Sequence, residues 1–291
     1  MARGPVIIEA AINGITQKAT NPNVPRSTEE IAADALACFE AGAAIVHNHV
    51  GVNGDPRAVA DEYLACWAPV LEARPDALIY PTANAIDGVL DLDHLALLAE
   101  SGQMRVSLCD PGSVNLGGVD DEGVPRGAFV YANSFDSIEE QFTRATKDRV
   151  GPSLAMYEPG FLRAAVAWWR AGRLPAGSMI KFYLATDRGY MGAPFGLPPT
   201  RLAVDAYIEA LGECPVPWAV SVVGGDVVET GLAEYAVERG GHIHLGLEFF
   251  AGDRTPTNAE LIAEAVAVCD RLGVPVATCD EAAEILDLPR R

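Results

Sequence analysis

The chain has 291 residues, of which 49% are hydrophobic and 21% are charged, a composition that is typical of globular proteins and excludes a disordered chain. Its 21 Lys and Arg residues face 40 Asp and Glu residues, which gives a formal net charge of −19. This charge excludes non-specific binding to nucleic acid or to an anionic membrane surface, because both need positive charge on the protein.

Three features of the sequence predict a cytoplasmic protein. The N-terminal stretch MARGPVIIEAAI lacks the apolar core and cleavage site of a signal peptide, and no apolar run reaches the roughly 18 residues of a membrane-spanning helix. The six cysteines form no Cys-x-x-Cys pair and show no regular spacing, which is typical of reduced, buried cysteines.

Short apolar runs alternate with longer helical stretches along the whole chain. Each run is brief and largely made of apolar, β-branched or aromatic residues, which favours a strand. The predicted strands are Val6–Ile12, Ala43–Val50, Ala77–Ala83, Arg105–Asp110, Ser153–Tyr157, Met179–Ala185, Trp218–Val223 and His242–Phe249.

Helical stretches follow nearly all of these strands. Ser27-x-x-Glu30 and Thr257-x-x-Glu260 are typical capping boxes, in which two side chains satisfy free backbone N–H groups at a helix start. The predicted helices are Thr28–Ala41, Arg57–Ala73, Asp91–Glu100, Ser137–Asp148, Gly160–Ala171, Thr200–Gly212, Val227–Arg239 and a last one that begins after Thr257 and ends near Gly273.

This alternation predicts an α/β fold with parallel strands, because a helix returns the chain after each strand. We expect a closed (β/α)8 TIM barrel that forms a single domain over residues 1–291. The alternative is an open doubly wound sheet, which usually has a Gly-x-Gly-x-x-Gly loop after its first strand; here that segment reads INGIT. Two long loops, Gly112–Asn133 and Thr186–Pro199, are of a length that is usually functional or mobile.

Four of the five histidines form two His-x-His pairs in predicted strands. His47 and His49 share one face of strand two, since side chains alternate along a strand. The same period places His242, His244 and Glu248 on one face of strand eight. Strands two and eight both flank strand one in a closed barrel, and barrel enzymes carry their catalytic groups at the carboxyl ends of the strands, where His49 and Glu248 stand.

We therefore predict a metal site formed by His47, His49 and Glu248. Two imidazoles and a carboxylate suit Zn²⁺ with one open position, and they also suit Fe(II), Mn²⁺ or Ni²⁺. In a straight strand His244 would lie about 13 Å deeper than Glu248, so both would reach one ion only if the strand bends.

Other enzyme classes are weaker interpretations of these residues. No Gly-x-Ser-x-Gly elbow is present, which argues against a serine hydrolase. An amidohydrolase would carry its His-x-His pair on strand one and further histidines on strands five and six, which have none here. Lys181 in strand six is a candidate for a Schiff base, with a structural ion pair as the alternative.

The residues at the two ends of the chain resemble a known family. The segment VIIEAAINGITQKATNPNVPRSTEEIAADALACFEAGAAIVHNHV resembles the N-terminal third of the β-keto acid cleavage enzymes, and GGHIHLGLEFFAGDRTPTNAELIAEAVAVCDRLGVPVAT resembles their C-terminal segment. Between them, LIYPTANA, SLCDPGSVNLG, LAMYEPG and WAVSVVGG stand where family strands are expected.

The resemblance implies a zinc-dependent barrel that condenses a β-keto acid with acetyl-CoA and cleaves the product to acetoacetate and a new acyl-CoA. It places the metal ligands on the same three residues that the strand argument selects, and it implies a homotetramer or another homo-oligomer. Because CoA is strongly anionic, the acidic chain then needs local basic groups, for which Arg188, Arg201 and Arg254 are candidates.

The chain departs from the family pattern at residues that bear on its chemistry. His244 stands where the family has an arginine and Phe249 where it has an acid, so His244 becomes the candidate catalytic base. Thr16 and Ala155 stand where the family has two glutamates near the substrate. Without those carboxylates a substrate ammonium has no partner, so we predict a β-keto acid without one.

The remaining polar residues at strand ends are candidate substrate contacts. Thr82 and Asn84 belong to the segment PTAN, which replaces the family sequence Ser-Thr-Gly-Gly, and Ser107 matches a family threonine. We expect Thr16, Thr82, Asn84 and Ser107 to bind substrate, with Ser107 also taking part in catalysis. Two alternatives remain: a CoA-independent lyase or hydrolase on the same metal site, and a metal-binding homologue without catalysis.

Overall fold

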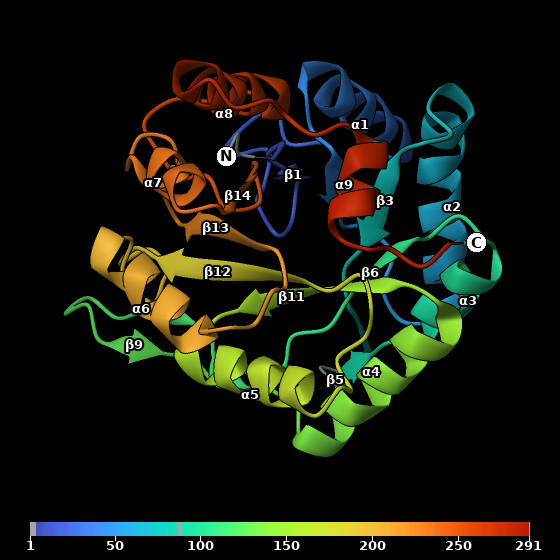
Figure 1. Ribbon diagram of the computed structural model, residues 1–291, viewed down its shortest axis with the longest axis horizontal. Coiled ribbons are helices and arrows are strands. Elements are labelled where there is room, and N and C mark those ends of the chain that lie inside the picture. The colour runs from blue at the N-terminus through green and yellow to red at the C-terminus, as the bar shows by residue number, and fades with distance from the viewer. Residues whose placement is uncertain (1–3, 87–88, 291) are drawn as a thin grey trace.

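The computed structural model describes residues 4–86 and 89–290 and has an eight-stranded parallel sheet at its centre (Figure 1). The strands follow one another around the sheet in chain order, with the first strand between the second and the last. The barrel strands are β1 (Ile8–Ala11), β2 (Ile45–Asn48), β3 (Leu78–Pro81), β6 (Val106–Leu108), β11 (Gly151–Met156), β12 (Met179–Ala185), β13 (Trp218–Val223) and β14 (His242–Leu245). β3 and β6 approach each other, so the barrel is nearly closed, which confirms the predicted (β/α)8 fold.

Helices surround the barrel and bury their apolar faces against its strands (Figure 1). They are α1 (Thr28–Ala41), α2 (Pro56–Ala73), α3 (Asp93–Glu100), α4 (Phe135–Asp148), α5 (Pro159–Arg170), α6 (Arg201–Leu211), α7 (Leu232–Glu238), α8 (Asn258–Leu272) and α9 (Cys279–Ile285). Both predicted capping boxes are confirmed at the starts of α1 and α8, and a third begins α9.

Three parts of the fold were not predicted from the sequence. A hairpin of β4 (Asn84–Ile86) and β5 (Val89–Asp91) follows β3. The predicted long loop after β6 contains β7 (Val114–Asn115), β8 (Gly118–Val119), β9 (Pro125–Arg126) and β10 (Val130–Tyr131), which pair antiparallel as β7 with β10 and β8 with β9. After α9, the terminal segment packs against the amino ends of β11 and β12, where Leu288 lies beside Gly151 and Gly177.

The last barrel strand is shorter than predicted. β14 ends at Leu245, and the prediction that the strand continues to Phe249 is wrong after that point. Gly246 has a φ of +131°, a conformation that favours glycine, and turns the chain away from the strand direction. Helix α7 is also shorter than the predicted Val227–Arg239, because residues 227–231 form turns.

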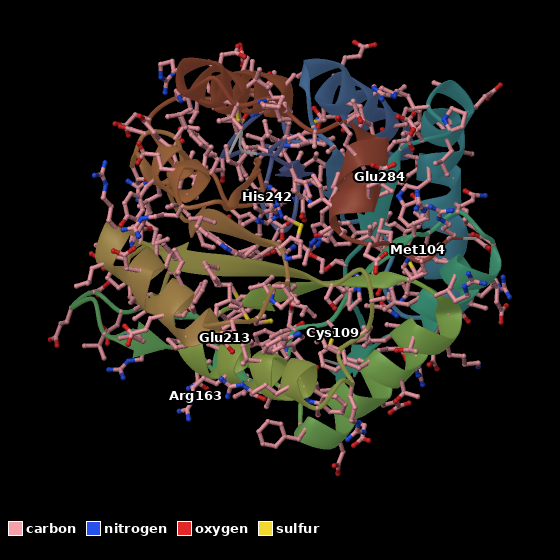
Figure 2. All side chains as sticks on the ribbon, in the orientation of Figure 1. Met104, Cys109, Arg163, Glu213, His242 and Glu284 are labelled. Atoms are coloured by element: carbon pink, nitrogen blue, oxygen red, sulfur yellow. The ribbon has the colours of Figure 1, made fainter. Side chains whose placement is uncertain are left out.

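The barrel strands are largely buried on both faces, as expected for a parallel sheet covered by helices. Arg163, by contrast, is exposed and projects from α5 away from the barrel (Figure 2). All six cysteines are free and buried, in agreement with their irregular spacing. Within the described residues, no helix is long and apolar enough to cross a membrane.

A buried asparagine fixes the turn that follows β14. The side-chain amide of Asn258, at the start of α8, donates to the carbonyl of Ile12 at 2.8 Å and to Oδ2 of Asp34 at 2.7 Å. Its Oδ1 accepts a hydrogen bond from the backbone N–H of Leu247 at 2.8 Å. These bonds hold the segment after β14 against the end of β1 and against α1. Burial raises the pKa of Asp34 to about 6, although its hydrogen bonds from Asn258 and Cys38 oppose that shift.

Replacing Asp34 with Asn tests this pKa. Because the folded pKa is raised, Asp34 contributes stability below its unfolded pKa of about 3.9, and this contribution disappears as the pH rises through about 6. Relative to the wild type, D34N should therefore gain about 2 kcal/mol in free energy of unfolding between pH 4 and pH 7.5, measured by urea denaturation. The exposed Asp61→Asn is the control and should show no such gain. Parallel pH profiles for D34N and wild type would contradict this assignment.

Candidate metal centre

The two predicted imidazole ligands lie at the carboxyl end of β2. His47 is within the strand, and the intervening Asn48 points to the opposite side, where its Oδ1 accepts a hydrogen bond from the indole of Trp67 at 2.9 Å. His49 follows the strand, and Asn13 fixes its backbone on both sides: His49 N donates to Asn13 Oδ1 at 2.8 Å, and Asn13 Nδ2 donates to the His49 carbonyl at 3.0 Å. The end of β1 thus holds the His-x-His segment.

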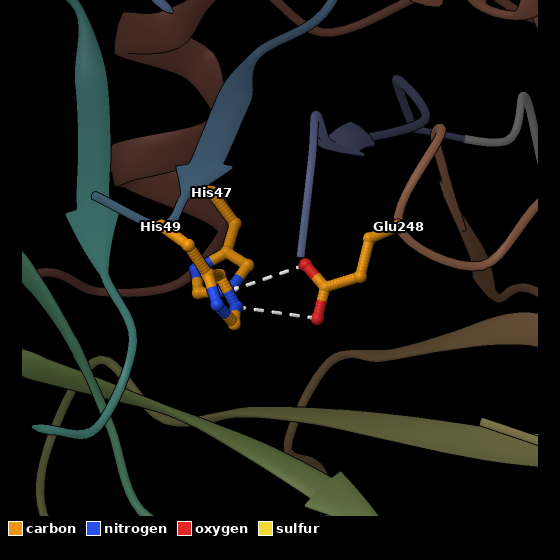
Figure 3. Close-up of side chains that lie close together, drawn as sticks. All are labelled: His47, His49 and Glu248. Atoms are coloured by element: carbon orange, nitrogen blue, oxygen red, sulfur yellow. Dashed lines mark ion pairs between the residues drawn. The ribbon is translucent and has the colours of Figure 1, made fainter. Parts of the chain in front are cut away.

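Glu248 reaches the same place from the turn after β14. The Glu248 backbone N–H donates to the carbonyl of Ala11 at 3.1 Å, which anchors the turn on β1. Figure 3 shows its carboxylate facing the two imidazoles across a short gap. His47 Nε2 lies 3.5 Å from Glu248 Oε2, and His49 Nε2 lies 3.3 Å from Glu248 Oε1 (Figure 3).

These three side chains can hold a metal ion. Each offers one ligand atom, and the three atoms lie within 4.8 Å of one another. His49 Nε2 and Glu248 Oε2 are buried and have no hydrogen-bond partner among the described residues. Because a buried polar atom without a partner is costly, an ion between them would satisfy both. Two nitrogen donors and one oxygen donor are a set that Zn²⁺ and other divalent transition metals accept.

The local electrostatics keep His47 and Glu248 in the protonation states that a metal needs. Burial lowers the pKa of His47 to about 3, so its imidazole is neutral and its ligand nitrogen keeps a lone pair. Burial alone would raise the pKa of Glu248, but His49 and His47 outweigh it and bring that pKa to about 2. The Tyr190 hydroxyl donates to Glu248 Oε1 at 3.0 Å and so orients the carboxylate.

A glycine leaves the space that the Glu248 side chain occupies. Gly14, just after β1, has a φ of +50°, and a Cβ placed on it would lie 2.2 Å from Cγ of Glu248. No other residue type fits here without displacing the carboxylate, because the contact is far below van der Waals distance and the backbone is left-handed. The Gly in the INGIT segment therefore positions a ligand.

The candidate metal centre opens into a cavity of about 570 Å³ at the carboxyl ends of the strands. His47, His49 and Glu248 line one side of it, and Thr82 and Asn84 lie in the wall next to them. Asn84 is held by the loop after β2: its Nδ2 donates to the Gly54 carbonyl at 2.8 Å, and its Oδ1 accepts from Gly54 N at 3.1 Å.

The other predicted site residues lie outside the lining of this cavity. The Thr16 hydroxyl donates to the backbone carbonyl of Glu248 at 3.4 Å. Ser107 lines a separate small cavity between β6 and helices α3 and α4. His244 is fully buried, with its ring stacked on that of Tyr183. His242 lies at the other end of the barrel, where its Nδ1 accepts from the backbone N–H of Ile7 at 3.0 Å.

Among the arginines, Arg26 lines the cavity and the three predicted CoA contacts do not. Arg254 forms ion pairs with Asp226 and Glu264, Arg201 lies over the ring of Tyr235, and Arg188 is exposed. Arg26 donates through Nη1 to the Gly14 carbonyl, while its Nε and Nη2 are buried with no hydrogen-bond partner among the described residues.

The strand pattern also held signals that the sequence analysis did not use. Glu9 in β1 is a charged residue inside an apolar run, and it lies buried in the barrel interior beside Lys181. Asp110, considered only as a strand-end residue, lies buried in the cavity wall. Asn13 gave no sequence signal, because its role depends on contacts with a segment 36 residues away.

The two imidazoles, the carboxylate and the cavity all lie at the carboxyl ends of the barrel strands, where barrel enzymes carry their active sites. The family model of the beta-keto acid cleavage enzymes matches residues 5–288. The chain therefore belongs to the beta-keto acid cleavage enzyme family.

Curated relatives agree with this membership, and a solved structure agrees with the fold. The chain is 27% identical to the 3-keto-5-aminohexanoate cleavage enzyme of Acetoanaerobium sticklandii, over 98% of this chain and 99% of that protein. It is also 27% identical to the 3-oxoadipate:acetyl-CoA acetyltransferase of Cupriavidus necator, over 98% of this chain and 95% of that protein. The apo structure of ObcA has the same fold, with a TM-score of 0.70, 16% identity, and coverage of 92% of this chain and 66% of that one.

Replacing Gly14 with Ala tests the geometry of the centre. The added methyl group should displace the Glu248 carboxylate and lower the amount of zinc bound per chain by at least about tenfold, measured by elemental analysis after dialysis against limiting zinc. Gly160→Ala is the matched control, because a Cβ at Gly160 meets open space. Full zinc binding by G14A would mean that Glu248 is not a ligand.

Proposed function

We propose that this protein is a zinc-dependent acyltransferase that condenses a β-keto acid with acetyl-CoA and releases acetoacetate and a new acyl-CoA. One observation carries the proposal: in a chain of this family, His47, His49 and Glu248 converge on the wall of a cavity large enough for a small keto acid. The acetyl-CoA-dependent activity in the name of the Cupriavidus necator relative supports acetyl-CoA as the second substrate.

His47, His49 and Glu248 would hold the zinc ion, and Zn²⁺ when bound acts as a Lewis acid that polarises a carbonyl oxygen. The chain keeps these ligands ready through contacts of its own. Asn13 fixes the backbone of His49, and Tyr190 fixes the carboxylate of Glu248. Pre-organised ligands lose little entropy on binding, so the centre need not rearrange when substrate enters.

Polar groups in the cavity wall would bind the substrates. Thr82 and Asn84 line the wall beside the ligands, which supports them as substrate contacts. The free N–H groups of Arg26 suit an anionic group, either a carboxylate or a phosphate of CoA. Three predicted site residues lie outside the cavity lining: Ser107, Thr16 and His244. In this proposal they do not touch the substrate, and they act only through the residues that do.

The cavity favours a β-keto acid with an uncharged side chain. Apolar and aromatic residues form much of the wall, among them Leu116, Phe129, Tyr157 and Tyr183. Asp110 also lines the cavity, but its Oδ1 accepts a hydrogen bond from the Ala155 backbone N–H and its Oδ2 accepts one from the Tyr131 hydroxyl. Burial also raises the pKa of Asp110, which disfavours its charged form. Apart from the proposed metal ligand Glu248, the described residues of the cavity lining offer a substrate ammonium no free carboxylate.

The reaction is tested with a panel of β-keto acids incubated with zinc-loaded protein and acetyl-CoA. We expect mass spectrometry to show acetoacetate and a new acyl-CoA. His49→Ala should lower both the bound zinc and the rate by about 100-fold or more, because it removes a ligand. His242→Asn is the control, since it changes a histidine at the other end of the barrel. Turnover without a new thioester would instead indicate a CoA-independent lyase or hydrolase, and zinc binding without turnover a binding protein.

The substrate class is tested with one matched pair of keto acids. We expect kcat/KM for 3-ketohexanoate to exceed that for 3-keto-5-aminohexanoate by about tenfold or more, because an unpaired ammonium costs at least about 1.4 kcal/mol in such a cavity. The Acetoanaerobium sticklandii enzyme, assayed in parallel, should prefer the aminated acid named in its activity. A preference of this protein for the aminated acid would overturn the uncharged side chain but leave the reaction class intact.

A further inference from the structure

Four polar side chains meet inside the barrel at the floor of the cavity. Glu9 from β1, Tyr80 from β3, Lys181 from β12 and His244 from β14 form this floor cluster, and each is at most 4% exposed. Glu9 and His244 are register partners on neighbouring strands. The cluster therefore brings together residues that are up to 235 positions apart in the chain.

One carboxylate oxygen organises the floor cluster. Lys181 Nζ donates to Glu9 Oε1 at 3.1 Å and to the Tyr80 hydroxyl oxygen at 2.7 Å. The Tyr80 hydroxyl in turn donates to Glu9 Oε1, and His244 Nε2 lies 3.4 Å from that oxygen. A buried ion pair adds little net stability compared with apolar side chains of the same volume, because desolvation opposes the attraction. Stability alone therefore does not account for Lys181 and Glu9.

Lys181 is the charged member of the floor cluster that reaches the cavity. Lys181 and Tyr80 line the cavity, whereas Glu9 and His244 do not. An ammonium has three N–H groups, and two of those of Lys181 go to Glu9 and Tyr80. Within the described part of the chain, the hydrogen bonds of Nζ end at these two acceptors, which leaves the third N–H without one. It is free to donate to a molecule in the cavity.

The floor cluster lies directly against the candidate metal centre. The ring of Tyr80 packs on that of His47, with centroids 4.6 Å apart. The positive charge of Lys181 also reaches His47, where it adds to the effect of burial in lowering the imidazole pKa. A small anion bound at the centre would thus lie near the Lys181 ammonium.

We propose that Lys181 binds an anionic oxygen of the β-keto acid at the metal centre, with Glu9 and Tyr80 as the residues that position its ammonium. This inference rests on the proposed function, because it concerns the substrate of that site. Lys181 supplies from β12 the positive charge that the family pattern would place at position 244. His244 does not supply it, because burial lowers its pKa well below the usual range and leaves the ring neutral.

The contacts also separate this role from Schiff-base chemistry. An ammonium paired with a carboxylate has no free electron pair with which to attack a carbonyl carbon. The ion pair with Glu9 at 3.1 Å therefore favours binding through charge over a covalent role. Borohydride in the presence of acetoacetate should leave the mass of Lys181-containing peptides unchanged, and a reduced adduct on Lys181 would overturn the inference.

The test measures binding, so it does not depend on turnover. Acetoacetate and its uncharged methyl ester are titrated into zinc-loaded protein by calorimetry. Lys181→Met should weaken acetoacetate binding by about 10- to 100-fold, the loss expected for a hydrogen bond to a charged group, and should change ester binding little. A merely structural role would weaken both ligands alike. The exposed Lys147→Met is the matched control and should change neither.

A second variant guards against misfolding. Lys181→Met alone leaves Glu9 as an unpaired buried charge, so Glu9→Gln/Lys181→Met removes both charges together. This double variant should bind zinc fully, bind the ester normally and show the same selective loss for acetoacetate. Equal acetoacetate binding by wild type and double variant would overturn the role of Lys181 and leave the proposed function standing. Failure of the wild type to bind acetoacetate would overturn the proposed function itself, and the inference with it.

Discussion

The candidate centre depends on the tight contact between the turn after β14 and the end of β1. A Cβ on Gly246 would lie 2.1 Å from the carbonyl oxygen of Ala11, so the two backbones touch there with no room for a side chain. The same carbonyl accepts the hydrogen bond from Glu248 N. Because the chain leaves the direction of β14 at this contact, the Glu248 carboxylate lies at the carboxyl ends of the strands, opposite His47 and His49. Gly14 on the facing loop leaves the volume into which the side chain fits.

The candidate metal centre at the mouth of the barrel and the floor cluster inside it carry different charges. At the mouth, two imidazoles and one carboxylate leave buried polar atoms that suit a cation. At the floor, Lys181 and Glu9 carry opposite charges whose sum is zero, so the interior keeps a positive group without a net charge. A divalent metal ion bound by the Glu248 carboxylate would keep a net positive charge. Lys181, paired with Glu9, adds a second positive group to the lining of the same cavity. That distribution suits an anionic substrate in a protein whose overall charge is −19.

Two residues at which the sequence departs from the pattern it resembles, His244 and Phe249, lie together beside the floor cluster. His244, at the family's arginine position, contacts Glu9, and Glu9 contacts Lys181. Phe249, at the family's acidic position, packs on the rings of Tyr183 and His244. Because these residues touch, a change in one alters the packing or charge that the others require.

The sequence by itself determined the strand and helix order and the three candidate ligands. Apolar runs between capped helices are local signals, and His47 and His49 share a face because of strand geometry alone. The tertiary structure decided the rest, because it depends on contacts between distant segments. Glu248 reaches the centre through a turn at Gly246, and the alternation of side chains along a strand does not predict that turn. Ser107, the register partner of Pro152, lines a separate side cavity. The partners of Lys181 lie 101 and 172 residues away, so only the closed barrel brings that charge to the cavity floor.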